Sequence, residues 1–100
     1  MSFCLIVKSY STIEENVIVN TSAIVDHDCL IQEFSHISPG AILAGNVTIG
    51  PNSWIGIGAR IIRGVTLGKG VIVAAGSTVT KSYPGKVMLA GTPAKIKREL

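Results

Sequence analysis

Hydrophobic residues recur at every sixth position of this chain, without interruption, from residue 1 to residue 79. This column holds only aliphatic residues: Met1, Val7, Ile13, Val19, Val25, Ile31, Ile37, Leu43, Ile49, Ile55, Ile61, Leu67, Val73 and Val79. A second column, four positions after the first, holds only small or β-branched residues from Ser11 to Ser77. A helix repeats about every 3.6 residues and a half-buried strand every 2, so a strict period of six fits neither as a long element. The pattern predicts short strands separated by corners.

Three six-residue repeats are expected to form one triangular coil, in which residues 18 positions apart stack on one another. The aliphatic column then fills the interior of the prism, and the small column relieves crowding beside the corners. Nine of the 11 glycines lie between residues 40 and 76, where tight corners need a permissive backbone. The sequence therefore predicts an all-β fold, a parallel β-helix of a little over four coils that forms a domain across residues 1–83.

The six-residue period ends at the turn signal Tyr83-Pro84-Gly85. Residues 87–89 are apolar and resemble a short strand. Thr92 and Pro93 follow, and they have the preferences of a helix N-cap and of a first helical position. We therefore expect residues 84–100 to form a turn, a strand and a short helix packed on the last coil.

Large apolar residues also occur five positions after the aliphatic column, where side chains should point outward on the flat faces of the prism. They are Ile6, Ile18, Ile24, Leu30, Ile42, Trp54 and Ile72, in a chain that is 47% hydrophobic. Closed symmetric oligomers usually bury such faces. The three-sided prism therefore suggests a homotrimer.

Several observations limit where the protein acts and what it binds. No apolar stretch approaches the roughly 20 residues of a membrane span, and the opening MSFCLI lacks the basic region of a signal peptide. Cys4 and Cys29 do not make a disulfide framework, since Cys29 lies in the inward small column. The net charge of +3 comes without the aromatic interleaving or arginine-rich face of a nucleic-acid surface. We expect a cytoplasmic protein with no membrane span and no nucleic-acid partner.

Several motifs are similar to those of a known family. The hexads IGPNSW (49–54) and LGKGVI (67–72), with AAGSTV (74–79) and AGTPAK (90–95), resemble the hexapeptide-repeat acyltransferases, which are left-handed β-helices. The segments VDHDCLI (25–31), FSHI (34–37) and LAGNV (43–47) are similar to the sialic-acid and bacillosamine-type sugar O- and N-acetyltransferases. The resemblance extends from about Tyr10 onward and implies a left-handed coil, acetyl-CoA as co-substrate, and a sugar or nucleotide-sugar acceptor.

His27 is the candidate catalytic base. Transfer of an acyl group from CoA needs a base for the acceptor's amine or hydroxyl, and donors that stabilise the oxyanion at the thioester. Asp28 can hold one ring nitrogen, as the acid after the catalytic histidine does in the resembled enzymes, although Asp26 is equally near in sequence. Gly45 follows His27 by three hexads, so it should lie one coil above. Its missing side chain leaves space for a thioester, and its N–H can serve as an oxyanion donor.

The resemblance implies further contacts with acetyl-CoA and the acceptor. His36 corresponds to a second histidine of the family, which contacts the acetyl-CoA carbonyl. Ile57 and Ala75, also three hexads apart, match positions that bind the CoA arm through backbone groups. Asn20 matches a polar position in the acceptor site, but asparagine at a corner is often a turn residue.

Basic residues continue the column of the candidate base. Arg63 and Lys81 follow at steps of three hexads, and residues 95–98 are also basic. These charges either line a path for the phosphates of CoA or are solvated at outward corners.

Two other classes of function are compatible with the fold. The γ-class carbonic anhydrases bind zinc through three histidines, whereas this chain has 2, so no metal is predicted. A non-catalytic or remnant trimer is the main alternative, because the resembled sugar acetyltransferases carry an N-terminal nucleotide-sugar-binding domain and this chain begins within the repeat. The sequence favours an acetyl-CoA-dependent acetyltransferase in which the acceptor attacks the thioester directly, without a covalent enzyme intermediate.

Overall fold

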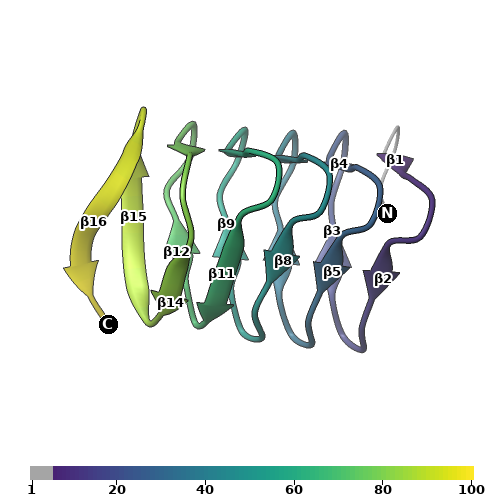
Figure 1. Ribbon diagram of the computed structural model, residues 1–100, viewed down its shortest axis with the longest axis horizontal. Helices are drawn as coiled ribbons and strands as arrows, with labels where there is room; N and C mark the ends of the chain where they lie inside the picture. Colours follow the sequence, from purple (N-terminus) through teal and green to yellow (C-terminus); the bar gives the residue numbers. More distant parts are fainter. Residues whose placement is uncertain (1–5) are drawn as a thin grey trace.

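The chain folds as a triangular prism of stacked coils, and the computed structural model describes residues 6–100 (Figure 1). Each coil contributes one short strand to each of three sheets. Sheet A contains β1 (Ile6–Val7), β4 (Ile24–Val25), β7 (Ile42–Leu43), β10 (Arg60–Ile61) and β13 (Thr78–Val79). Sheet B contains β2 (Thr12–Ile13), β5 (Leu30–Ile31), β8 (Thr48–Ile49), β11 (Thr66–Lys69) and β14 (Tyr83–Gly85). Sheet C contains β3 (Ile18–Val19), β6 (His36–Ile37), β9 (Trp54–Ile55), β12 (Ile72–Val73), β15 (Val87–Gly91) and β16 (Ala94–Glu99).

The pairing of strands follows the predicted repeat of three hexads. Strands of successive coils are parallel, and paired positions are three hexads apart, as with Ile24 and Ile42. In the last coil Leu67 pairs with Tyr83, two positions short of that spacing. The coil therefore shortens where the hexad period ends in the sequence.

The interior of the prism is filled by the aliphatic column. Its ten members from residue 25 to residue 79 are each at most 1% exposed: Val25, Ile31, Ile37, Leu43, Ile49, Ile55, Ile61, Leu67, Val73 and Val79. In the first coil, Val7 and Ile13 are 40% and 37% exposed, because a neighbouring coil covers them on one side only. Met1, the first member of the column, lies outside the described residues. The predicted inward face is confirmed.

The outer faces of the sheets differ in polarity. The seven apolar residues predicted to point outward are half-buried or exposed: Ile6, Ile18, Ile24, Leu30, Ile42, Trp54 and Ile72. Sheets A and C carry six of them, whereas sheet B presents Leu30 together with Thr12, Thr48 and Thr66. Sheet A is thus apolar in its first three coils and then presents Arg60 and Thr78, sheet C is mainly apolar, and sheet B is mainly polar.

The predicted C-terminal helix is wrong. Residues 94–99 form β16, which runs antiparallel to β15 and pairs with it from Gly91 and Ala94 to Val87 and Glu99. Thr92 and Pro93, joined by a cis peptide bond, form the turn of this hairpin. The local helix-start preference is outweighed because a strand here pairs with the otherwise open edge of sheet C and buries Ala94 to 2% exposure. The described residues contain no helix long and apolar enough to cross a membrane.

Candidate active site

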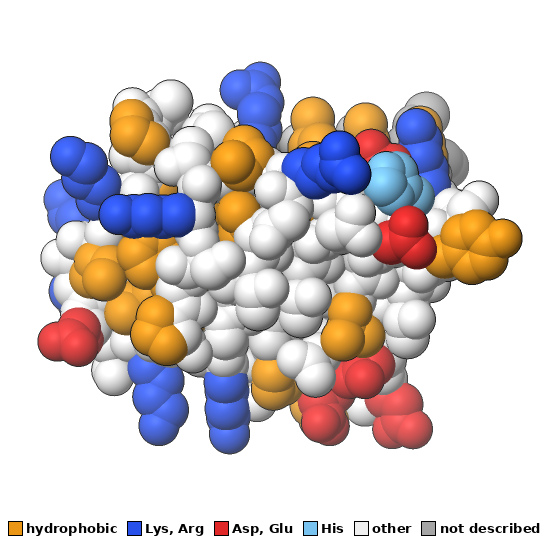
Figure 2. All heavy atoms as spheres, viewed as in Figure 1, with side chains coloured by type: hydrophobic (Ala, Val, Ile, Leu, Met, Phe, Trp, Pro, Cys, Tyr) orange, Lys and Arg blue, Asp and Glu red, His pale blue; other side chains and the backbone are white. Residues whose placement is uncertain are grey.

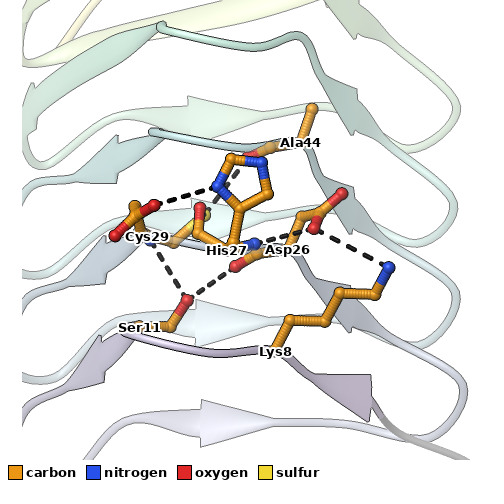
Figure 3. A network of polar contacts seen from close by, with 7 residues as sticks. Lys8, Ser11, Asp26, His27, Cys29 and Ala44 are labelled. Atoms are coloured by element: carbon orange, nitrogen blue, oxygen red, sulfur yellow. Dashed lines mark hydrogen bonds and ion pairs between the residues drawn. The ribbon is translucent and has the colours of Figure 1, made fainter.

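His27 lies at the corner between β4 and β5, with Asp26 before it and Asp28 after it in the chain. Figure 3 shows the His27 ring among its polar neighbours. Its Nδ1 is 3.0 Å from Oδ2 of Asp28. Asp26 does not contact the ring: its Oδ1 accepts the backbone N–H of His27 at 2.7 Å and lies 3.9 Å from Nζ of Lys8. Both acids were candidates to hold the ring on the sequence alone. In the structure Asp28 contacts the ring and Asp26 contacts the backbone. A carboxylate on Nδ1 favours the tautomer in which Nε2 is the basic nitrogen.

The ring of His27 lies directly against the backbone of Gly45, one coil above. A Cβ at position 45 would lie 2.7 Å from both Cε1 and Nε2 of the ring. In the structure the imidazole itself therefore fills the space that the missing side chain leaves. Among the described residues no hydrogen bond from the N–H of Gly45 is found. Gly45 is buried, and the Cε1–Nε2 edge of the His27 ring lies against its backbone.

Cys29 is two residues from His27 but is unsuited to act as a nucleophile. Its side chain is 2% exposed, and its thiol donates to the carbonyl oxygen of Ala44 at 3.1 Å. Burial raises the pKa of the Cys29 thiol, so the reactive thiolate is disfavoured. The other cysteine, Cys4, lies outside the described residues.

A second group of predicted residues lines a hollow on sheet C and the corner that follows it. The hollow has a volume of about 320 Å³, and its wall is formed by His36, Ser38, Pro39, Trp54, Gly56, Ile57, Ile72, Val73, Ala74 and Ala75. Three residues assigned to acetyl-CoA from the family resemblance, His36, Ile57 and Ala75, therefore meet in one place. Most of the lining side chains are apolar.

Trp54 is the residue of this hollow whose role the sequence did not indicate. Its indole stacks on the imidazole of His36, with ring centroids 4.1 Å apart and planes inclined by 22°. The two residues are partners on β6 and β9, and Trp54 is half exposed. The sequence marked Trp54 only as outward-facing. Its position three hexads after His36 was the signal that it stacks there.

The base and the hollow lie on different corners of the same chain. None of the residues that line the hollow comes from the corner of His27. Asn20 follows β3 on the corner next to the hollow, and its Oδ1 accepts the N–H of Thr21 at 2.8 Å. The structure thus gives Asn20 a turn contact and places it away from the His27 corner of its own chain.

Charge is distributed unevenly along the axis of the prism. Five of the six acidic residues precede position 34, and eight of the nine basic residues occur from position 60 onward. Figure 2 shows acidic side chains gathered near the N-terminal coils and basic ones near the C-terminal coils. An anion that lies along the prism is therefore drawn toward the C-terminal coils.

Comparison with known proteins connects these features to a group of transferases. Residues 46–81 match the family model described as bacterial transferase hexapeptide, six repeats. A 2,3,4,5-tetrahydropyridine-2,6-dicarboxylate N-acetyltransferase of Staphylococcus aureus is 43% identical over 72 residues, which cover 64% of this chain and 30% of that protein. The chain spans only about a third of the length of the curated relatives it matches.

Two solved structures are also similar. One is PerB from Caulobacter crescentus in complex with CoA and GDP-perosamine, with a TM-score of 0.93 and 42% identity over 94% of this chain and 45% of that one. The other is the acetyltransferase domain of PglB from Neisseria gonorrhoeae, with a TM-score of 0.86 and 42% identity over 95% of this chain and 52% of that one. These similarities confirm the predicted fold class, a left-handed parallel β-helix.

Proposed function

We propose that this chain, which carries the hexapeptide repeats of bacterial transferases, moves an acetyl group from acetyl-CoA to an amine or hydroxyl of a sugar or nucleotide-sugar. The observation that carries the proposal is the His27–Asp28 pair, 3.0 Å apart, with the ring of His27 against the backbone of Gly45. The similarity to PerB, whose structure holds CoA and GDP-perosamine, supports the donor and the class of acceptor. Acetyl-CoA and nucleotide-sugars are cytoplasmic metabolites, so we place the reaction in the cytoplasm.

The proposed reaction uses His27 as a general base. Nε2 takes the proton from the acceptor's amine or hydroxyl as that group attacks the thioester carbon. Asp28 stabilises the imidazolium that forms, and the N–H of Gly45 donates to the developing oxyanion. The carbon–sulfur bond then breaks, an amide or ester remains on the acceptor, and the CoA thiolate recovers the proton from His27. Burial of Cys29 supports this direct transfer, since the nearby thiol is not available as an intermediate carrier.

The donor is proposed to lie along the hollow of sheet C. Its apolar wall suits the uncharged arm of CoA, with backbone groups of Ile57 and Ala75 as partners and His36 near the thioester. The phosphates would then point toward the basic C-terminal coils. Arg63 and Lys81 lie in the column of His27, so the candidates to bind these phosphates are Arg63 and Lys81 of a neighbouring copy.

A complete site of this kind needs two copies of the chain. In one prism the base and the hollow lie on different corners, and the apolar outer faces of sheets A and C are available for contact with other copies. We therefore propose a homotrimer in which His27 of one chain faces the hollow of the next.

Light scattering at micromolar concentration is expected to give a mass of about three chains, because the apolar faces would otherwise be exposed to water. As a control, Thr48→Lys on the mainly polar sheet B should leave this mass unchanged, and Ile42→Lys on sheet A should lower it. A wild-type chain that stays monomeric would contradict the shared site.

Binding of acetyl-CoA can be followed through Trp54, the single tryptophan in the chain. Emission should shift to shorter wavelength as the donor displaces water from the indole in the hollow. Ala75→Phe, which fills the hollow, should weaken binding at least about tenfold, whereas His27→Ala on the other corner should bind normally. Release of CoA thiol is then measured with GDP-perosamine, glucosamine and L-serine as acceptors. No response of Trp54 together with no thiol release would refute the proposed function.

A further inference from the structure

One residue of every six adopts a left-handed backbone conformation at the corners of the prism. Most of the side chains at these positions are small or are of types that tolerate positive φ: Asn16, Ser22, Asp28, Gly40, Asn46, Asn52, Gly58, Gly64, Gly70 and Gly76. Two aromatic residues break the rule, Tyr10 with φ 62° and Phe34 with φ 61°. A bulky side chain in this region costs stability, and such outliers concentrate at functional sites.

Packing does not compensate for the conformation of Tyr10. Its side chain is 88% exposed, more than the 56% of Phe34. Within residues 6–100 its hydroxyl makes no hydrogen bond. Neither packing nor a side-chain hydrogen bond within the described prism accounts for an aromatic ring at this position.

Tyr10 lies at the corner of the candidate base. It occupies the same column as Asp28, one coil nearer the N-terminus, and the N–H of Asp28 donates to the carbonyl of the adjacent Ser9 at 3.1 Å. Successive coils are about 4.8 Å apart, so the backbone of Tyr10 lies about one strand spacing from that of Asp28. Gly45 lies on the opposite side of His27, one coil toward the C-terminus. The base is thus bordered by the oxyanion donor on one side and by an exposed aromatic ring on the other.

We propose that Tyr10 is the platform for the sugar ring of the acceptor. A pyranose has a face of C–H groups that packs on an aromatic ring, while its amine or hydroxyl groups point outward from the ring edge. A sugar seated on Tyr10 would reach past Asp28 to bring such a group to Nε2 of His27, the ring nitrogen that lies beside Gly45. The inference rests on the proposed function and assigns the acceptor side of the same site.

Phe34 provides a matched control for Tyr10. It has the same strained conformation and is also exposed, but it lies at the corner between sheets B and C, away from His27. Replacement by asparagine, which tolerates positive φ, should raise the melting temperature in both Tyr10→Asn and Phe34→Asn. Only Tyr10→Asn should weaken binding of a sugar.

The test is calorimetric binding of GDP-perosamine and glucosamine to the full chain, which requires no turnover. Tyr10→Asn is expected to raise the Kd about tenfold, while Tyr10→Phe and Phe34→Asn keep the wild-type value, and binding of L-serine is unaffected by all three. Wild-type affinity in Tyr10→Asn, equal losses in Phe34→Asn, or no binding of either sugar to wild type would overturn the platform. Failure of the proposed function is read separately, as the absence of any response of Trp54 to acetyl-CoA together with no release of CoA thiol.

Discussion

Ile49→Asp is expected to abolish folding, whereas Thr48→Asp on the same strand should be nearly silent. Ile49 is 0% exposed in the interior of the prism, where it pairs between Ile31 and Leu67 of the adjacent coils. An unpaired carboxylate there would cost several kcal/mol, against a total stability of about 5–15 kcal/mol for a domain of ordinary size. Thr48 points outward on sheet B and is only half-buried, so a charge there remains hydrated.

Circular dichroism during thermal unfolding measures this difference. Val73 is also 0% exposed, so Val73→Asp should abolish folding as Ile49→Asp does. Loss of folding in both variants would show that the effect belongs to the aliphatic column rather than to one site. Similar melting curves for the inward and outward variants would mean that the assigned register of the coil is incorrect.

The coil could be predicted because one pattern determines both local structure and packing. Each inward residue such as Ile49 meets its neighbours three hexads before and after, so a periodic sequence specifies the register of every strand. The C-terminal end lacks this redundancy. There the local preference of Thr92 and Pro93 for a helix start competes with backbone pairing along the edge of β15, and only the folded chain shows that pairing prevails.

The candidate site was predictable to the extent that it depends on the same spacing. His27 and Gly45 stack because they are three hexads apart, and the structure places the ring against the glycine. The choice between Asp26 and Asp28 depends on side-chain direction, which spacing does not give. Asp28 has φ 57°, at a left-handed corner, and its carboxylate reaches Nδ1, whereas Asp26 accepts the backbone N–H.

His27→Ala should lower the rate of acetyl transfer by roughly 10²- to 10⁴-fold, because proton transfer to a positioned general base accelerates a reaction by about that factor. Affinity for acetyl-CoA should be almost unchanged, since Nε2 acts on the acceptor and the hollow of sheet C lies on another corner. The loss should therefore fall on kcat with a demonstrated acceptor, and Trp54 emission should report normal binding of the donor.

The two neighbouring aspartates provide a matched pair of controls. Asp28→Asn retains a hydrogen-bonding group beside Nδ1 but loses the charge that stabilises the imidazolium, so its rate should lie between those of wild type and His27→Ala. Asp26→Asn changes a carboxylate that contacts the backbone and not the ring, and its rate should stay near that of wild type. Equal losses in both variants would indicate a general effect of negative charge.

The role of His27 is tested most directly by the rate of CoA thiol release from wild type and from His27→Ala, measured at saturating acetyl-CoA with the same acceptor. We predict a fall of at least about a hundredfold, with an unaltered acetyl-CoA titration of Trp54. An unchanged rate in His27→Ala would contradict the assignment of the base and leave His36 as the other histidine to test.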